Sequence, residues 1–176
     1  MKRQWRIFLR IATTLFCVVV VAWIFSHSLQ TGAESAAQSS SIVDALQKFA
    51  KKIAPNSWVA NATDEAYDRL HSIVRVLAHW AEFALMGFSF ALCYVSWTEV
   101  RNWLYIPLCG IVMIPIIDEG LQYFTAGRGA QMGDVLVDCF GGVCGFCFVM
   151  GVLWLVYRIS KNKRIGRGGV YGARKS

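Results

Sequence analysis

Charged residues are scarce in this chain. Only 16% of its 176 residues are Asp, Glu, Lys or Arg, whereas about a quarter of an ordinary soluble domain is charged. At the same time, 56% of the residues are hydrophobic. Such a chain cannot avoid burying apolar surface, which excludes intrinsic disorder and disfavours a soluble globular domain. The composition indicates a small integral membrane protein of one domain.

The polar loops contain no cysteine. All six cysteines lie inside apolar stretches, including Cys144 and Cys147 of a Cys-x-x-Cys pair that has no histidine nearby. We therefore interpret them as small hydrophobic residues, and not as a disulfide framework, a redox pair or a zinc site. The sequence also lacks GxSxG, P-loop and HExxH motifs, so nucleophilic serine chemistry and nucleotide hydrolysis have no support.

Four stretches are apolar enough to cross a bilayer as helices, although single polar residues and prolines interrupt them. A span needs about 20 residues, and proline is tolerated where neighbouring helices satisfy the carbonyl that it frees. The predicted spans are residues 8–26, 76–96, 103–118 and 135–157. The sequence therefore predicts an all-α, four-helix membrane bundle that forms a single domain over residues 1–176.

Acidic residues are missing from both ends of the chain. Four bases and no acid lie at the N-terminal end up to Arg10, and seven bases and no acid lie in the tail 158–176. Between the first two spans, five bases are balanced by five acids. The positive-inside rule then predicts a multi-pass membrane protein with both termini in the cytoplasm. We interpret the basic tail as an anchor of this topology, with no nucleic acid as partner.

The first outer loop contains a helical pattern. Apolar side chains recur at helical spacing over residues 42–53, with charged residues on the other faces. Ser41 and Asp44 resemble a capping box at its start. The pattern predicts an amphipathic helix that lies either in the outer membrane interface or on the protein's own outer surface. Residues 63–65 are predicted to start a helix that runs into the second span.

Most ionisable side chains at membrane depth fall near the outer ends of the predicted spans. His71, Arg75, His79 and Glu82 share one face of the second span, and Asp138 follows Asp134 by one turn on the fourth. Charges near the bilayer centre cost at least about 2.5–3.5 kcal/mol each, so we expect the two faces to meet across a cleft. The candidate residues are Arg75, His79, Glu82, Asp118, Glu119, Gln122, Arg128, Asp134 and Asp138.

Several chemistries could use this cluster. Arginine binds phosphate or carboxylate with two hydrogen bonds, which suits an anionic lipid headgroup or a cell-wall precursor. The predicted binding residues are Arg75, His79, Glu82, Glu119, Gln122, Arg128 and Asp138. The candidate catalytic acids, bases or metal ligands are His79, Glu82, Asp118, Glu119, Asp134 and Asp138. A salt-bridge network that only locks the bundle is the alternative interpretation.

No metal motif of fixed spacing is present, so no cofactor is predicted, although the same side chains could hold a divalent cation. Gly141 and Gly145 form a small-xxx-small pattern that lets another helix approach closely. That helix could belong to the same chain or to a second copy, which leaves a homo-oligomer through Gly141 and Gly145 open.

Two sequence blocks resemble the VanZ-like family of bacterial membrane proteins. The first is similar to its second-helix signature and reads Arg75-x-x-Ala78-His79-x-x-Glu82-Phe83, followed by Gly87. The second block reads Asp118-Glu119-x-x-Gln122-x-Phe124, then Gly127-Arg128, Asp134, Asp138, Gly141 and Gly145. Thr125-Ala126 stands where the family pattern leads us to expect a proline. The resemblance covers residues 20–150.

The resemblance implies a four-helix protein of the bacterial cell envelope. The family's named member is associated with resistance to the glycopeptide teicoplanin, but the family has no established reaction. We therefore expect a protein that binds or remodels an extracytoplasmic lipid or cell-wall precursor and so affects glycopeptide susceptibility. A membrane-embedded, metal-assisted hydrolase or transferase acting on a lipid-linked substrate is the alternative, and the absence of a reaction-specific motif favours the first.

The predicted orientation can be tested directly. A reporter protein fused after Ser176 should be active in the cytoplasm, because the bases that flank the first and fourth spans hold both ends inside. Activity of the same reporter on the outer side would contradict the orientation and, with it, the placement of the polar cluster.

Overall fold

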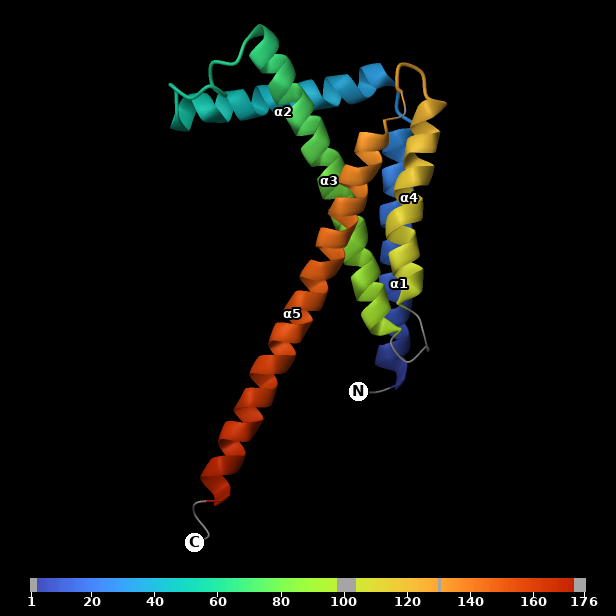
Figure 1. The fold of residues 1–176 in the computed structure, drawn as a ribbon, viewed down its shortest axis with the longest axis vertical. Helices are drawn as coiled ribbons and strands as arrows, with labels where there is room; N and C mark the ends of the chain where they lie inside the picture. Colours follow the sequence, from blue (N-terminus) through green and yellow to red (C-terminus); the bar gives the residue numbers. More distant parts are fainter. Residues whose placement is uncertain (1–2, 98–103, 130, 173–176) are drawn as a thin grey trace.

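The chain folds into five α-helices in the computed structural model (Figure 1). The structure describes residues 3–97, 104–129 and 131–172, with side chains as far as residue 162. The helices are α1 (Arg3–Ser28), α2 (Gly32–Ile53), α3 (Asp64–Ser96), α4 (Tyr105–Tyr123) and α5 (Met132–Gly172). Within the described ranges there is no strand, so the predicted all-α fold is confirmed.

Four of the helices form the bundle. Helix α3 packs against α1 and α5, and α4 packs against α1, α3 and α5. Successive bundle helices run in opposite directions, so that α1 begins and α5 ends towards the same end of the bundle (Figure 1). The stretches long and apolar enough to cross a membrane are Arg3–Ser28, Asp64–Ser96, Tyr105–Tyr123 and Met132–Asn162. The four predicted spans are therefore present, whereas the cytoplasmic side stays a prediction.

The third and fourth spans extend further than predicted. Helix α4 continues past residue 118 to Tyr123, which places Asp118, Glu119 and Gln122 within the helix. The predicted start of this span at Trp103 lies outside the described residues. Helix α5 continues past residue 157 into the basic tail as far as Gly172, and the tail side chains from residue 163 onwards also lie outside the described part.

Helix α2 begins ten residues before the predicted helical pattern. Thr31 is its N-cap: the Thr31 hydroxyl accepts from the Glu34 N–H, and the Thr31 N–H donates to the Glu34 carboxylate at 2.8 Å. This capping box replaces the one expected at Ser41 and Asp44, which was wrong. Thr31-x-x-Glu34 is the stronger signal because the Glu side chain is long enough to reach back to the cap. The Thr31 N–H also holds the pKa of Glu34 below its ordinary value.

Helix α2 lies across one end of the bundle (Figure 1). Val43 is fully buried against α3 in a small core with Leu70 and Val74. The other large apolar residues of its pattern are exposed, namely Ile42, Leu46, Phe49 and Ile53. One row of α2 thus packs on the protein, and a second row stays available to a membrane interface. Helix α3 starts after its N-cap Thr63, as predicted.

At the other end of the bundle, α1 is tied to the last turn of α3. The Arg10 Nε donates to the Ser96 carbonyl at 3.1 Å, and its guanidinium lies 5.0 Å from the centre of the Trp97 ring. Thr13 and Ser96 share a hydrogen bond of 2.8 Å between their hydroxyls. These contacts explain how a charged residue is accommodated within the first span, because its hydrogen-bonding capacity is used inside the protein.

Helices α3 and α5 cross at very short range. A Cβ atom added at Gly145 would overlap the carbonyl oxygen of Ala84, and one added at Gly141 would overlap that of Trp80. From the other side, a Cβ at Gly87 would overlap the carbonyl oxygen of Gly142. The small-xxx-small pattern therefore packs against α3 of the same chain. The face of α5 that carries Gly141 and Gly145, which was also a candidate contact with a second copy of the chain, is therefore in contact with α3.

The crossing gives a prediction. Gly145→Ala should lower the melting temperature of the purified protein, because the added methyl group must push α3 and α5 apart, and overpacking costs about 1–3 kcal/mol. Gly151→Ala is the matched control on the same helix, since nothing lies within 4 Å of its added Cβ. Circular dichroism on heating in detergent measures both. Equal melting temperatures for the two variants would contradict the close crossing.

Candidate functional site

Two adjoining cavities lie at the end of the bundle that α2 covers. Their volumes are about 230 and 160 Å³. Both are lined by Ser35 of α2, by Arg75 and His79 of α3, and by Arg128 of the loop between α4 and α5. Because these four residues border both spaces, the cavities form one polar region between the end of the bundle and the first turns of α2.

The polar faces of α3 and α5 lie opposite each other in this region. The Arg75 guanidinium is 3.6 Å from the Asp134 carboxylate, and one turn deeper the His79 Nδ1 is 3.6 Å from Asp138 Oδ1. Side-chain exposure falls from 46% at Arg75 to 0% at Asp138. The structure therefore brings together the two rows of residues that helical spacing had placed on facing sides.

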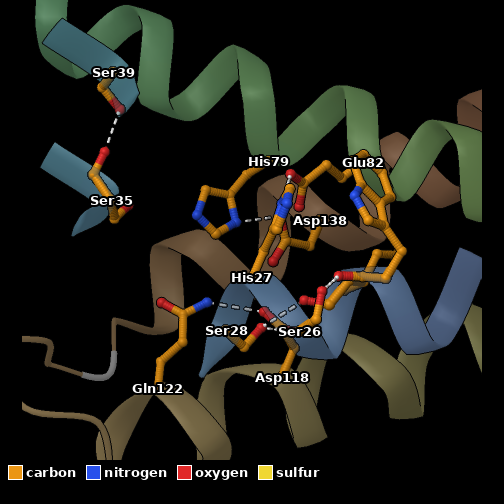
Figure 2. Close-up of polar contacts among 12 residues, drawn as sticks. Ser26, His27, Ser28, Ser35, Ser39, His79, Glu82, Asp118, Gln122 and Asp138 are labelled. Atoms are coloured by element: carbon orange, nitrogen blue, oxygen red, sulfur yellow. Dashed lines mark hydrogen bonds and ion pairs between the residues drawn. The ribbon is translucent and has the colours of Figure 1, made fainter. Parts of the chain in front are cut away.

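Asp118 of α4 reaches the same depth from a third helix. The Ser28 hydroxyl donates to its Oδ1, and the Gln122 side-chain amide donates to its Oδ2 at 2.8 Å (Figure 2). Asp118, Ser28 and Gln122 are all buried. The two hydrogen bonds fix the orientation of the carboxylate and satisfy one position on each of its oxygens.

His79, Asp118 and Asp138 form a compact group at the floor of the cavities. Each offers one nitrogen or oxygen atom, and these three atoms lie within 4.8 Å of one another. Among the described residues, nothing hydrogen-bonds to the His79 Nδ1 or to either oxygen of Asp138. Buried polar side-chain atoms nearly always have a hydrogen-bond partner, so the lack of one at these atoms requires an explanation.

His27 and Ser28 are part of the site but were not predicted. Both lie in the last turn of α1, and the His27 Nδ1 is 2.7 Å from Glu82 Oε1 of α3 (Figure 2). The sequence contained a signal for them, since they are adjacent polar residues at the outer end of the first span, level with Glu82. Glu82 and both α1 residues line the smaller cavity.

Glu119 was predicted to bind the ligand, but its side chain contacts the loop between α4 and α5 and not the cavities. Its Oε1 accepts a hydrogen bond from the Gln131 backbone N–H, which holds the loop between α4 and α5. It is not among the described residues that line either cavity. Glu119 follows Asp118 directly, and neighbouring residues of a helix point about 100° apart, so the two carboxylates serve different structures.

The loop between α4 and α5 packs against the start of α2. The Gly32 N–H donates to the Ala126 carbonyl at 3.0 Å, and a Cβ at Gly32 would overlap the carbonyl oxygen of Gly127. Gly127 itself has a φ of +74°, a left-handed conformation that favours glycine. This contact fixes the turn that carries Arg128 into the wall of both cavities.

Arg128 is a half-buried cation with no partner among the described residues. No described side chain hydrogen-bonds or ion-pairs with its guanidinium. Burial lowers the pKa of Arg128, the Asp118 carboxylate opposes this, and the neighbouring Arg75 cation lowers the pKa further. Arginine nevertheless stays protonated at every physiological pH, so the cavities hold two arginine charges, of which one pairs with Asp134.

The predicted site residues thus fall into four groups. The larger cavity is lined by Arg75, His79, Gln122, Arg128 and Asp134. Glu82 borders the smaller cavity together with Arg75, His79 and Arg128. Asp118 and Asp138 lie buried beneath, and Glu119 lies apart. These positions suit the binding of an anion at the arginines and of a cation at the buried carboxylates.

Four apolar spans around a buried polar site define the class, a multi-pass membrane protein. The family model described as VanZ/LLP1 matches residues 13–157, most of the chain, and the protein belongs to this family. The resemblance carried by the two sequence blocks is therefore confirmed. Neither the comparison with curated proteins nor the comparison with solved structures found a match.

Proposed function

We propose that this protein binds the phosphate group of a lipid or a lipid-linked cell-wall precursor at the outer face of the bacterial plasma membrane. The observation that carries the proposal is the pair of arginines, Arg75 and Arg128, in the wall of the same two cavities. The two cations repel each other, as the lowering of the Arg128 pKa by the Arg75 charge shows. A phosphate between them would relieve the repulsion and accept hydrogen bonds from both.

The position of the cavities supports a ligand that is anchored in the bilayer. They lie beside the first turns of α2, whose exposed apolar row would rest in the membrane interface. A phosphate at that depth is level with the headgroups, and its lipid chain can remain in the bilayer. In the predicted orientation, this end of the bundle faces outwards, where cell-wall precursors are used.

A protein that holds a precursor at the outer face would change how much of it is available to glycopeptide antibiotics. We therefore extend the proposal to teicoplanin susceptibility, on the strength of the family association. Turnover is not part of the proposal, because the sequence has no reaction-specific motif. A hydrolase or transferase acting on the same ligand class is the alternative that the experiment separates.

The proposal is tested with the full-length protein in lipid nanodiscs. Polyprenyl phosphate and phosphatidylglycerol are compared with their phosphate-free counterparts, polyprenol and diacylglycerol. We expect at least one of the two anionic lipids to bind more tightly than its comparison lipid, and Arg75→Gln and Arg128→Gln to weaken that binding. Each should weaken it about 10–100-fold, because a hydrogen bond to a charged group contributes about 1.5–3 kcal/mol. The two anionic lipids distinguish a precursor carrier from a bulk headgroup as the ligand.

Arg69→Gln is the matched control on α3. Arg69 is exposed, pairs with Glu65 one turn away and lies outside both cavities, so its removal should leave binding unchanged. Equal affinity for polyprenyl phosphate and polyprenol, together with no preference for phosphatidylglycerol, would contradict the proposal. Release of inorganic phosphate from either ligand would overturn the binding role in favour of hydrolysis.

A further inference from the structure

The group at the floor of the cavities has donor atoms from three different helices. His79 comes from α3, Asp118 from α4 and Asp138 from α5, and one ligand atom of each lies within 4.8 Å of the others. This spacing lets a single small ion contact all three. Residues so far apart in sequence follow no spacing motif, which is why the sequence identified these three only among six candidate ligands and predicted no cofactor.

In the described structure, no hydrogen bond satisfies the buried carboxylate of Asp138. Its side chain is 0% exposed, and neither of its oxygens has a hydrogen-bond partner in the described structure. The nearest donor is the His79 Nδ1 at 3.6 Å, which is too long for a hydrogen bond. Both side chains are directed towards each other (Figure 2), so their unpartnered atoms face one shared space.

Asp118 is held as a ligand would be. The hydrogen bonds from Ser28 and Gln122 fix the orientation of its carboxylate and leave further lone pairs on both oxygens. Hydrogen bonds of this kind from residues behind the ligands are a regular feature of metal sites, where they orient the ligand. Ser28 and Gln122 donate to Asp118 alone, so the ligand atoms of His79 and Asp138 are not involved in these hydrogen bonds.

We propose that His79, Asp118 and Asp138 bind one divalent transition-metal cation, Zn²⁺ or Mn²⁺. One imidazole nitrogen and two carboxylates are ligands that suit these ions. Two carboxylate charges would also neutralise the divalent ion in a region that lipid surrounds. Since His79 lines both cavities, the remaining coordination positions would open towards Arg75 and Arg128.

The metal site stands on this geometry alone, whereas its use rests on the proposed function. An ion below two arginines would add a third positive contact for a phosphate, so that headgroup and ion would bind more tightly together than apart. The competing explanation of the orphan atoms is a proton shared between Asp118 and Asp138. Metal titration separates these two explanations.

The experiment uses the full-length protein in detergent after treatment with a chelator. Calorimetric titration with ZnCl₂ and with MnCl₂, followed by metal analysis of the desalted protein, should give one ion per chain for at least one of the two metals. We expect His79→Gln and Asp138→Asn to abolish this binding, and Ser28→Ala to weaken it about 10–100-fold by freeing the Asp118 carboxylate. Asp68→Asn, which removes an exposed carboxylate from α3, should bind as the unmodified protein does.

Arg128→Gln separates this proposal from the proposed function. It should lose affinity for the lipid phosphate and keep the metal ion, since Arg128 is not one of the three ligands. All variants are first checked by circular dichroism and gel filtration. If His79→Gln or Asp138→Asn is misfolded, Asp118→Asn is tested in its place. Failure of the folded, unmodified protein to bind either metal, or equal metal affinity of Asp138→Asn, would overturn the site.

Discussion

The close crossing of α3 and α5 is the contact on which the site depends. Gly141 and Gly145 let the backbones of the two helices approach at Trp80 and Ala84, next to His79 and Asp138. At the usual helix separation of about 8–10 Å, side chains of ordinary length would fill this gap. Because glycine has no side chain, the two helices come close enough to place Arg75 opposite Asp134 and His79 opposite Asp138. The glycines thus determine which polar groups meet.

Around this crossing, the remaining elements complete the site from separate directions. Helix α1 adds His27 and Ser28, α4 adds Asp118 and Gln122, and the loop after α4 adds Arg128. Most of the polar groups at this end satisfy one another, as groups sheltered from water must. Among the described residues, the exceptions are the Arg128 guanidinium and four buried atoms, namely His79 Nδ1, Glu119 Oε2 and both carboxylate oxygens of Asp138. The arginine without a hydrogen-bonding anion leads to the first proposal, and the buried carboxylate without a hydrogen bond leads to the second.

Much of the fold could be predicted from the sequence, because a bilayer imposes length, hydropathy and charge bias on each span. Helical spacing also showed that Arg75 and His79 share a face, because that depends on one helix only. Features that depend on packing between helices could not be found in this way. The adjacent polar pair His27 and Ser28 was only a weak signal, because a serine or histidine at the end of a span is ordinarily explained by the interface. Likewise, only packing decides that Asp118 and not Glu119 faces the floor of the cavities.

The central claim is that the Asp138 carboxylate is buried without a hydrogen bond because it binds a metal ion, and that this burial lowers the stability of the metal-free protein. The most direct measurement compares the melting temperature of the metal-free protein with that of metal-free Asp138→Asn. If the claim holds, the variant melts at the higher temperature, because the substitution removes a buried carboxylate charge that no hydrogen bond satisfies. If Asp138 instead serves a network that locks the bundle, the variant melts at the lower temperature, and that result would contradict the account.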